Sequence, residues 1–164
     1  MTIAALIIFV GFVLAGVIKF GWQKSYSSYA TKWAEAVPID DHTYLWSIVT
    51  IIVALLMAIP MIGAGEGSPW QFLGFFSPVY LCIAALTPKY ETNKTQKIVH
   101  ITGTAICALV TLLWLGLVVG GWKVLVFSFI AAYVLAIVTK TIERSLLFWS
   151  EMAMFAAVFI KLLA

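Results

Sequence analysis

The side chains best suited to chemistry lie in two apolar segments of the sequence. In the segment from 98 to 119, five residues recur at intervals of four, three, four and three: His100, Thr104, Cys107, Thr111 and Trp114. This spacing places all five on one face of an α-helix. Imidazole, hydroxyl and thiol groups on one face suit either a polar cavity or hydrogen bonds to neighbouring helices. Both interpretations stay open, and His100 by itself fits a packing residue as well as a ligand.

An acidic residue lies inside the segment from 146 to 163. Glu151 is roughly 9 Å into this segment at a rise of about 1.5 Å per residue. An ionisable group at that depth in lipid needs a partner, a proton or water. We therefore expect Glu151 to line an inward-facing cavity, with His100 as its partner; a structural bond to another helix is the alternative. Arg144, seven residues earlier on the same face, and its neighbour Glu143 complete the predicted cavity site.

Membrane-spanning helices must position these residues. The 164-residue chain is 63% hydrophobic and 10% charged, with a mean hydropathy of +1.07. In soluble domains about 45–50% of residues are apolar and about 25% are charged, so a water-soluble fold is excluded. Continuous apolar runs, too long for barrel strands, predict an all-α polytopic membrane protein, a bundle of six transmembrane helices in a single domain over 1–164. The runs cover 2–20, 44–65, 71–87, 98–119, 122–139 and 146–163.

Charge placement predicts the orientation of this bundle. Eight of the ten Lys and Arg residues fall in or beside three connections: those between the first and second, third and fourth, and fifth and sixth spans. The positive-inside rule makes these connections cytoplasmic and places both termini outside, in a prokaryotic inner (cell) membrane. Because Thr2 follows Met1 with no basic region, we expect the first run to be a retained span and not a cleaved signal peptide.

No pattern in the sequence predicts a metal or a cofactor. Asp40, Asp41 and His42 directly precede the second span, but three consecutive residues cannot all face one metal, so Asp41 and its neighbours fit an N-cap. Cys82 and Cys107 both lie near mid-membrane, where we expect packing residues and no disulfide. The net charge of +3 suits anionic lipid headgroups and is too small for a nucleic-acid surface.

Small residues predict contacts with other membrane components. Gly11 and Ala15 form a small-xxx-small pair in the first span, and the fifth span carries Ala131, Ala132 and Ala136. Such residues allow helices to approach closely. We therefore expect membrane lipids as partners, together with a second copy of the chain or a partner membrane protein, and no nucleic acid.

Short motifs along the chain carry a family resemblance. They are Ser25-Tyr26-Ser27-Ser28-Tyr29 after the first span, Thr87-Pro88-Lys89-Tyr90 ending the third, His100 opening the fourth and Glu151 in the sixth. In this order the chain resembles a group of short prokaryotic six-span membrane proteins, and it is similar to the DRAM/FRAG-type membrane family. That family has six spans, a Ser-containing aromatic loop after the first span and an acidic residue late in the last.

The resemblance implies a role for the first loop. It assigns Ser25, Ser27 and Tyr29 to a loop motif, with Asp41 further along the same loop. It also implies that this loop lies on the non-cytoplasmic side, which is opposite to the side that the lysines predict.

Three functions are compatible with these residues. The favoured one is a cavity that binds or passes a small cation, a proton or a lipid headgroup. The second is an intramembrane lipid-modifying enzyme, with Glu151 and His100 as acid and base and Arg144 holding an anionic headgroup. The third is an accessory or structural subunit whose polar groups only join helices.

Overall fold

The structure is a computed structural model that describes residues 1–36 and 44–164. Within these ranges the chain forms α-helices and one π-helical turn, with no strand, so the predicted all-α class is confirmed. Asp41 lies outside the described residues, as do Asp40 and His42. The elements are α1 (Thr2–Phe20), α2 (Ser28–Ala36), α3 (Tyr44–Gly63), α4 (Leu73–Ala85), α5 (Lys94–Leu113), η1 (Trp114–Val118), α6 (Trp122–Val138) and α7 (Ile142–Leu163).

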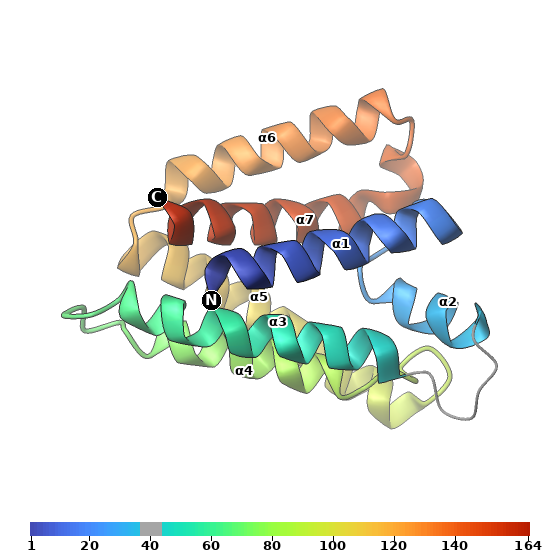
Figure 1. The fold of residues 1–164 in the computed structure, drawn as a ribbon, viewed down its shortest axis with the longest axis horizontal. Helices are drawn as coiled ribbons and strands as arrows, with labels where there is room; N and C mark the ends of the chain where they lie inside the picture. The colour runs from blue at the N-terminus through green and yellow to red at the C-terminus, as the bar shows by residue number, and fades with distance from the viewer. Residues whose placement is uncertain (37–43) are drawn as a thin grey trace.

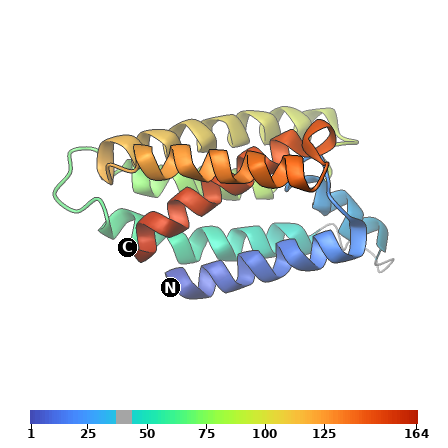
Figure 2. The same ribbon diagram turned by 90° about the horizontal axis from the view of Figure 1, so that it is seen from above.

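The apolar helices α1, α3, α4, α5, α6 and α7 all run from one end of the bundle to the other, with α7 crossing the others obliquely (Figures 1 and 2). The N- and C-termini lie at the same end of this bundle, together with the turn between α3 and α4. The segments after α1, α4 and α6 lie at the opposite end, and α2 lies beside them (Figure 1). The two ends of the bundle therefore differ: one carries the termini, and the other carries α2 and the segments after α1, α4 and α6.

Four helical segments are long and apolar enough to cross a membrane, fewer than the six expected from hydropathy. Among the described residues these are α1, α3, α5 continued by η1, and α7. Helix α6 has 17 residues and α4 only 13, a length of about 20 Å where a bilayer core measures about 30 Å. Helix α4 is short because turns occupy 64–72 before it and Pro88, which lacks a backbone donor, follows it.

Helix α2 is an element that hydropathy did not predict. Hydropathy predicts only a connection between the first two spans here, and this connection carries Lys24 and Lys32. In the structure Tyr29 and Ala30 of this helix are both fully buried. Gly16 of α1 makes room for Tyr29, because a Cβ at that glycine would lie 2.8 Å from the tyrosine ring. Burial of these two residues holds α2 against the bundle.

Close backbone contact joins α3 and α4. A Cβ added at Gly74 would lie 2.5 Å from the backbone oxygen of Met61. Only a residue without a side chain fits there, as in other membrane helix pairs that pack through small residues. Met61 directly follows Pro60, and its carbonyl also accepts a 3.1 Å hydrogen bond from Trp114 Nε1 in η1. The far end of α5 is thereby fixed to α3.

Large apolar side chains cover the outside of the bundle. Ile18 is 84% exposed, Val138 71% and Phe127 68%. In water such a surface would be strongly unfavourable, whereas lipid tails solvate it. The four long apolar helices and this outer surface together indicate a membrane location.

Candidate functional site

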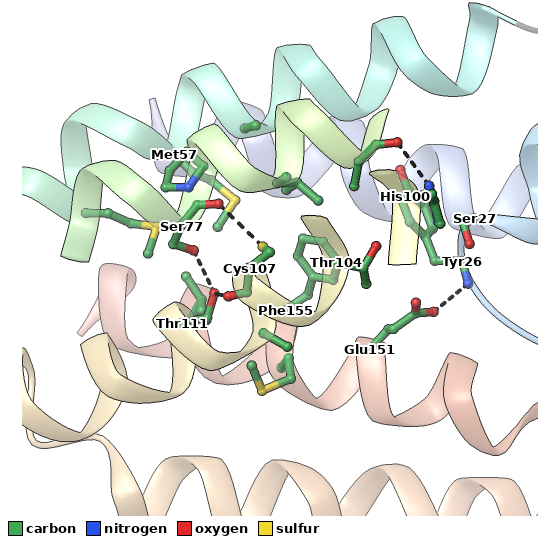
Figure 3. Close-up of a pocket in the computed structure, with 18 of the residues that line it drawn as sticks. Tyr26, Ser27, Met57, Ser77, His100, Thr104, Cys107, Thr111, Glu151 and Phe155 are labelled. Atoms are coloured by element: carbon green, nitrogen blue, oxygen red, sulfur yellow. Dashed lines mark hydrogen bonds between the residues drawn. The ribbon is translucent and has the colours of Figure 1, made fainter. Parts of the chain in front are cut away.

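A cavity lies inside the bundle between α3, α4, α5 and α7 (Figure 3). Its volume is about 110 Å³, several times the roughly 10–15 Å³ that one water molecule needs. Tyr26 and Ser27, from the segment between α1 and α2, line one end of it. Four helices and one connecting segment therefore line the same space.

One face of α5 forms a wall of this cavity. His100, Thr104, Cys107 and Thr111 all line it, as expected for residues that share a helical face. Thr111 lies eleven residues after His100, a rise of about 16 Å along α5. Trp114, the fifth residue of the predicted face, is fully buried beyond the cavity's end. The cavity therefore extends along α5, with His100 at one end and Thr111 at the other.

Glu151 projects from α7 into the end of the cavity near His100 (Figure 3). Its Oε2 accepts a 2.6 Å hydrogen bond from the backbone N–H of Tyr26. No described residue bonds to the second carboxyl oxygen, Oε1, and the side chain is only partly buried. Glu151 thus links α7 to the segment after α1 and still presents one oxygen for another partner.

His100 is held in one orientation by its Nδ1 atom. This nitrogen lies 3.0 Å from both the Ala84 carbonyl oxygen and Thr87 Oγ1. Because the Thr87 hydroxyl already donates to the Ala84 carbonyl at 2.6 Å, Nδ1 must carry a hydrogen to bond with that carbonyl. The neutral ring therefore presents Nε2 as an acceptor, and no described residue bonds to Nε2. Tyr90 stacks on the ring at 4.1 Å and 11°.

The expected pair of Glu151 and His100 is not formed. Among residues 1–36 and 44–164, no hydrogen bond or ion pair joins them; the backbone of Tyr26 takes the place that His100 was expected to fill. A backbone donor has no signature in the sequence, whereas a titratable side chain does, so the wrong partner was expected. The two residues nevertheless line the same end of one cavity.

Arg144 and Glu143 do not reach the cavity, contrary to expectation. Both side chains are exposed and neither lines it. The reason is a break in α7 at Ser145, whose φ of −131° and ψ of 26° are not helical. A seven-residue spacing keeps two residues on one face only when the helix between them is regular. Because the helix begins again after this break, the backbone N–H of Phe148 has no partner within the helix. It donates to the Lys24 carbonyl at 3.0 Å instead.

The predicted loop motif forms a hydroxyl cluster beside the cavity. Ser25 Oγ lies 3.0 Å from Ser27 Oγ and 2.9 Å from Ser28 Oγ. Ser27 in turn donates to the Tyr90 hydroxyl at 3.3 Å, and Tyr90 stacks on His100. Burial raises the pKa of Tyr90. This cluster connects the segment after α1 to the segment after α4 at the end of the cavity that contains His100 and Glu151.

Tyr29 faces away from this cluster. Its hydroxyl donates to the Gly21 carbonyl at 3.0 Å, and burial raises its pKa to about 12. The Tyr26 hydroxyl forms a 3.0 Å hydrogen bond with Thr50 Oγ1 of α3, and burial raises the pKa of Tyr26 as well. Tyr29 is therefore part of the packing of α1 and α2, whereas Tyr26 and Ser27 belong to the cavity.

The opposite end of the cavity contains polar groups that satisfy one another. Ser77 Oγ lies 2.6 Å from Thr111 Oγ1, and Cys107 Sγ donates to the Ser77 carbonyl at 3.4 Å (Figure 3). Thr111 also bonds to the Cys107 carbonyl at 2.7 Å. Ser77 was not among the expected site residues, although a hydroxyl next to Pro78 inside an apolar run is a usable signal. No three His, Cys, Asp or Glu side chains of the described ranges gather as metal ligands.

No protein-family model matches the chain, and no curated protein and no solved structure matches it.

Proposed function

We propose that the chain crosses the membrane six times. Helices α4 and α6 are short, but like the four long apolar helices they run from one end of the bundle to the other (Figures 1 and 2). An even number of crossings agrees with termini that lie at one end of the bundle (Figure 1). Local thinning of the bilayer accommodates spans of 13 and 17 residues.

The proposed orientation follows from the basic residues. Most of them lie near the segments after α1, α4 and α6, so we place that end in the cytoplasm and both termini outside. The membrane is then a prokaryotic cell membrane, as the resemblance to short prokaryotic six-span proteins suggests. Kinship with that group and with the DRAM/FRAG-type family is part of this proposal and rests on the quoted motifs.

We propose that the cavity binds a small cation, a proton or a lipid headgroup at Glu151. One observation carries this proposal: Glu151 Oε1 lines an internal cavity and has no partner among the described residues. An ionisable group inside a membrane bundle is costly unless it is compensated, and intramembrane acids commonly mark binding or transport sites. A ligand with a hydrogen-bond donor or positive charge supplies the missing compensation.

The two other functions have less support from the geometry. Acid–base catalysis by Glu151 and His100 needs a substrate held between the two groups, and beyond their place at the same end of the cavity no observation supports it. An accessory or structural role is favoured by the bond between Glu151 and the Tyr26 backbone, which joins two distant segments. These functions separate in an experiment that removes the charge of Glu151 and keeps this bond.

The Glu151→Gln variant makes that separation, because its amide oxygen can still accept from the Tyr26 N–H. Glu143→Gln is the matched control: it is the same change in the same helix, at an exposed position. Wild type and both variants are reconstituted, and proton and cation flux are measured across a pH series. Thermal stabilisation by Na⁺, K⁺, ethylammonium and phosphocholine is measured in parallel.

We expect at least one of these ions or headgroup analogues to bind or pass through wild type and the Glu143→Gln protein. We expect Glu151→Gln to lose this response while it stays folded. Equal responses in all three proteins would contradict the proposal. No response in any of them, with all three folded, would leave the structural role as the function of Glu151.

A further inference from the structure

The polar atoms of the cavity that lack partners lie at one end. Three of them can accept a hydrogen bond: Glu151 Oε1, His100 Nε2 and the Thr104 hydroxyl, none of which bonds to a described residue. One is a donor, the buried Nε1–H of Trp46, whose ring lies 6.1 Å from that of His100. The carboxylate oxygen and the imidazole nitrogen are acceptors, and the hydroxyl can also accept. This end of the cavity, which we call the head end, therefore offers three acceptors to a ligand.

The rest of the cavity offers no free polar group of this kind. Ser77, Cys107 and Thr111 are bonded to one another. Phe155 lies between them and the head end, and Met57 lies beside Ser77 (Figure 3); both are apolar. Methionine adapts its shape to irregular apolar ligands. A ligand that fills this space must therefore be polar at the head end and apolar along its remaining length.

We propose that the cavity binds a single-chain amphiphile whose headgroup is an ammonium. This inference rests on the proposed function, because it assigns the ligand of the same Glu151 site. The ammonium group lies at the head end against Glu151 and His100, and the alkyl chain runs along α5 toward Thr111. The distance of about 16 Å along α5 between His100 and Thr111 sets the length available for the ligand.

The choice of an ammonium follows from hydrogen-bond types. A primary ammonium has three donors and no acceptor, so it can pair with the three acceptors of the head end and leaves the buried Trp46 N–H unpaired, as it is in the structure. Its charge also compensates the carboxylate, as a buried charge requires. An alcohol supplies one donor and no charge, and a fatty acid brings a second carboxylate next to Glu151. The expected order of affinity is therefore amine, then alcohol, then carboxylate.

The experiment uses alkylamines that carry a photoreactive diazirine at the end of the chain. Proteoliposomes of wild type, Glu151→Gln and Glu143→Gln are irradiated with this probe, and labelled residues are identified by mass spectrometry. Alcohol and carboxylate analogues with the same chain are compared at equal content in the membrane. We expect label on cavity residues such as Met57, Cys107 and Phe155. Glu151→Gln should reduce this label about tenfold or more, because a hydrogen bond to a charged group is lost.

The result separates this inference from the proposed function. If ethylammonium stabilises wild type through Glu151 but the tail probe labels only outward residues such as Ile48 and Leu135, the amphiphile inference is wrong and the headgroup site stands. Equal labelling by the alcohol and the amine overturns the ammonium assignment. If the tail probe does not depend on Glu151, and neither ion flux nor stabilisation by any of the ions and headgroup analogues depends on it, both proposals fail.

A second variant covers the case in which Glu151→Gln does not fold. Thr104→Leu enlarges a side chain inside the cavity and leaves Glu151 unchanged. Thr102→Leu is the same change two residues earlier, at an exposed position outside the cavity. We expect Thr104→Leu to lose the cavity label and Thr102→Leu to keep it. Equal labelling of both variants overturns the inference.

Discussion

The Glu151 carboxylate and the Tyr26 backbone N–H form a 2.6 Å hydrogen bond across 125 residues of sequence. The bond connects the middle of α7 with the segment that leaves α1. It uses one carboxyl oxygen and leaves the other at the head end of the cavity. A single side chain therefore has a structural contact and a candidate ligand contact, and substitutions can separate the two.

Glu151→Ala should destabilise the protein more than Glu151→Gln. The alanine variant leaves the Tyr26 N–H without a partner, a cost of about 1–3 kcal/mol for a buried donor, whereas glutamine can still accept. Unfolding in mixed micelles, followed by tryptophan fluorescence, measures the difference. Glu143→Ala, at an exposed site, should change the free energy of unfolding little. Equal stabilities of the alanine and glutamine variants at 151 would show that the bond contributes nothing.

Gly74→Ala should weaken the packing of α3 against α4. The added Cβ meets the Met61 backbone oxygen at 2.5 Å, and backbone atoms cannot move aside as a flexible side chain can. Overpacking of this kind costs about 1–3 kcal/mol. Gly63→Ala is the control, because a Cβ there has no atom within 4 Å. Thermal unfolding of the two variants tests the prediction, which fails if both match wild type.

Alkaline pH should destabilise the protein partly through Tyr29. Its pKa rises from 10.0 to about 12 on burial, so the folded protein holds this proton more tightly than the unfolded chain. The stabilisation is complete below about pH 10 and is lost as the pH rises through 12. Between pH 9 and pH 11, the free energy of unfolding of Tyr29→Phe should therefore fall by about 1 kcal/mol less than that of wild type.

Unfolding of the Tyr29→Phe protein at the two pH values gives this difference directly. Tyr44→Phe, which changes an exposed tyrosine, should retain the pH dependence of wild type. The assignment to Tyr29 is wrong if both phenylalanine variants lose the same stability as wild type.

Tyr90→Ala should open the head end of the cavity. It removes the ring that stacks on His100 and the hydroxyl that bonds to Ser27. Tyr90→Phe removes only the hydroxyl. With Cys82 replaced by alanine, we expect a small thiol reagent to modify Cys107 severalfold faster in Tyr90→Ala than in Tyr90→Phe. Identical rates would mean that the ring does not control access.

The sequence predicted helices well where hydropathy dominates. The limits of α1 match the expected span, and α3 begins at Tyr44 as expected. Periodicity also predicted that His100, Thr104, Cys107 and Thr111 share one face, because a regular helix repeats every 3.6 residues. These inferences depend only on local spacing, which the sequence states directly.

Other features depend on contacts that local spacing does not encode. The partner of Glu151 is a backbone N–H, which every residue except proline possesses. Arg144 was placed beside Glu151 by assuming a regular helix, and the break at Ser145 removes that relationship. Helix α2 is polar enough to look like a loop, and the burial of Tyr29 and Ala30 against the bundle explains its position. In each case tertiary contacts decide the outcome.

The hydrogen bonds that join residues 24–26 to residues 148–151 also determine when this part of the structure can assemble during synthesis. Lys24 and Tyr26 leave the ribosome early, but their partners Phe148 and Glu151 are made only when α7 is translated. Until then, the head end of the cavity lacks both its carboxylate and one of its walls. Assembly of the candidate site therefore waits for the synthesis of α7, the last helix of the chain to be translated.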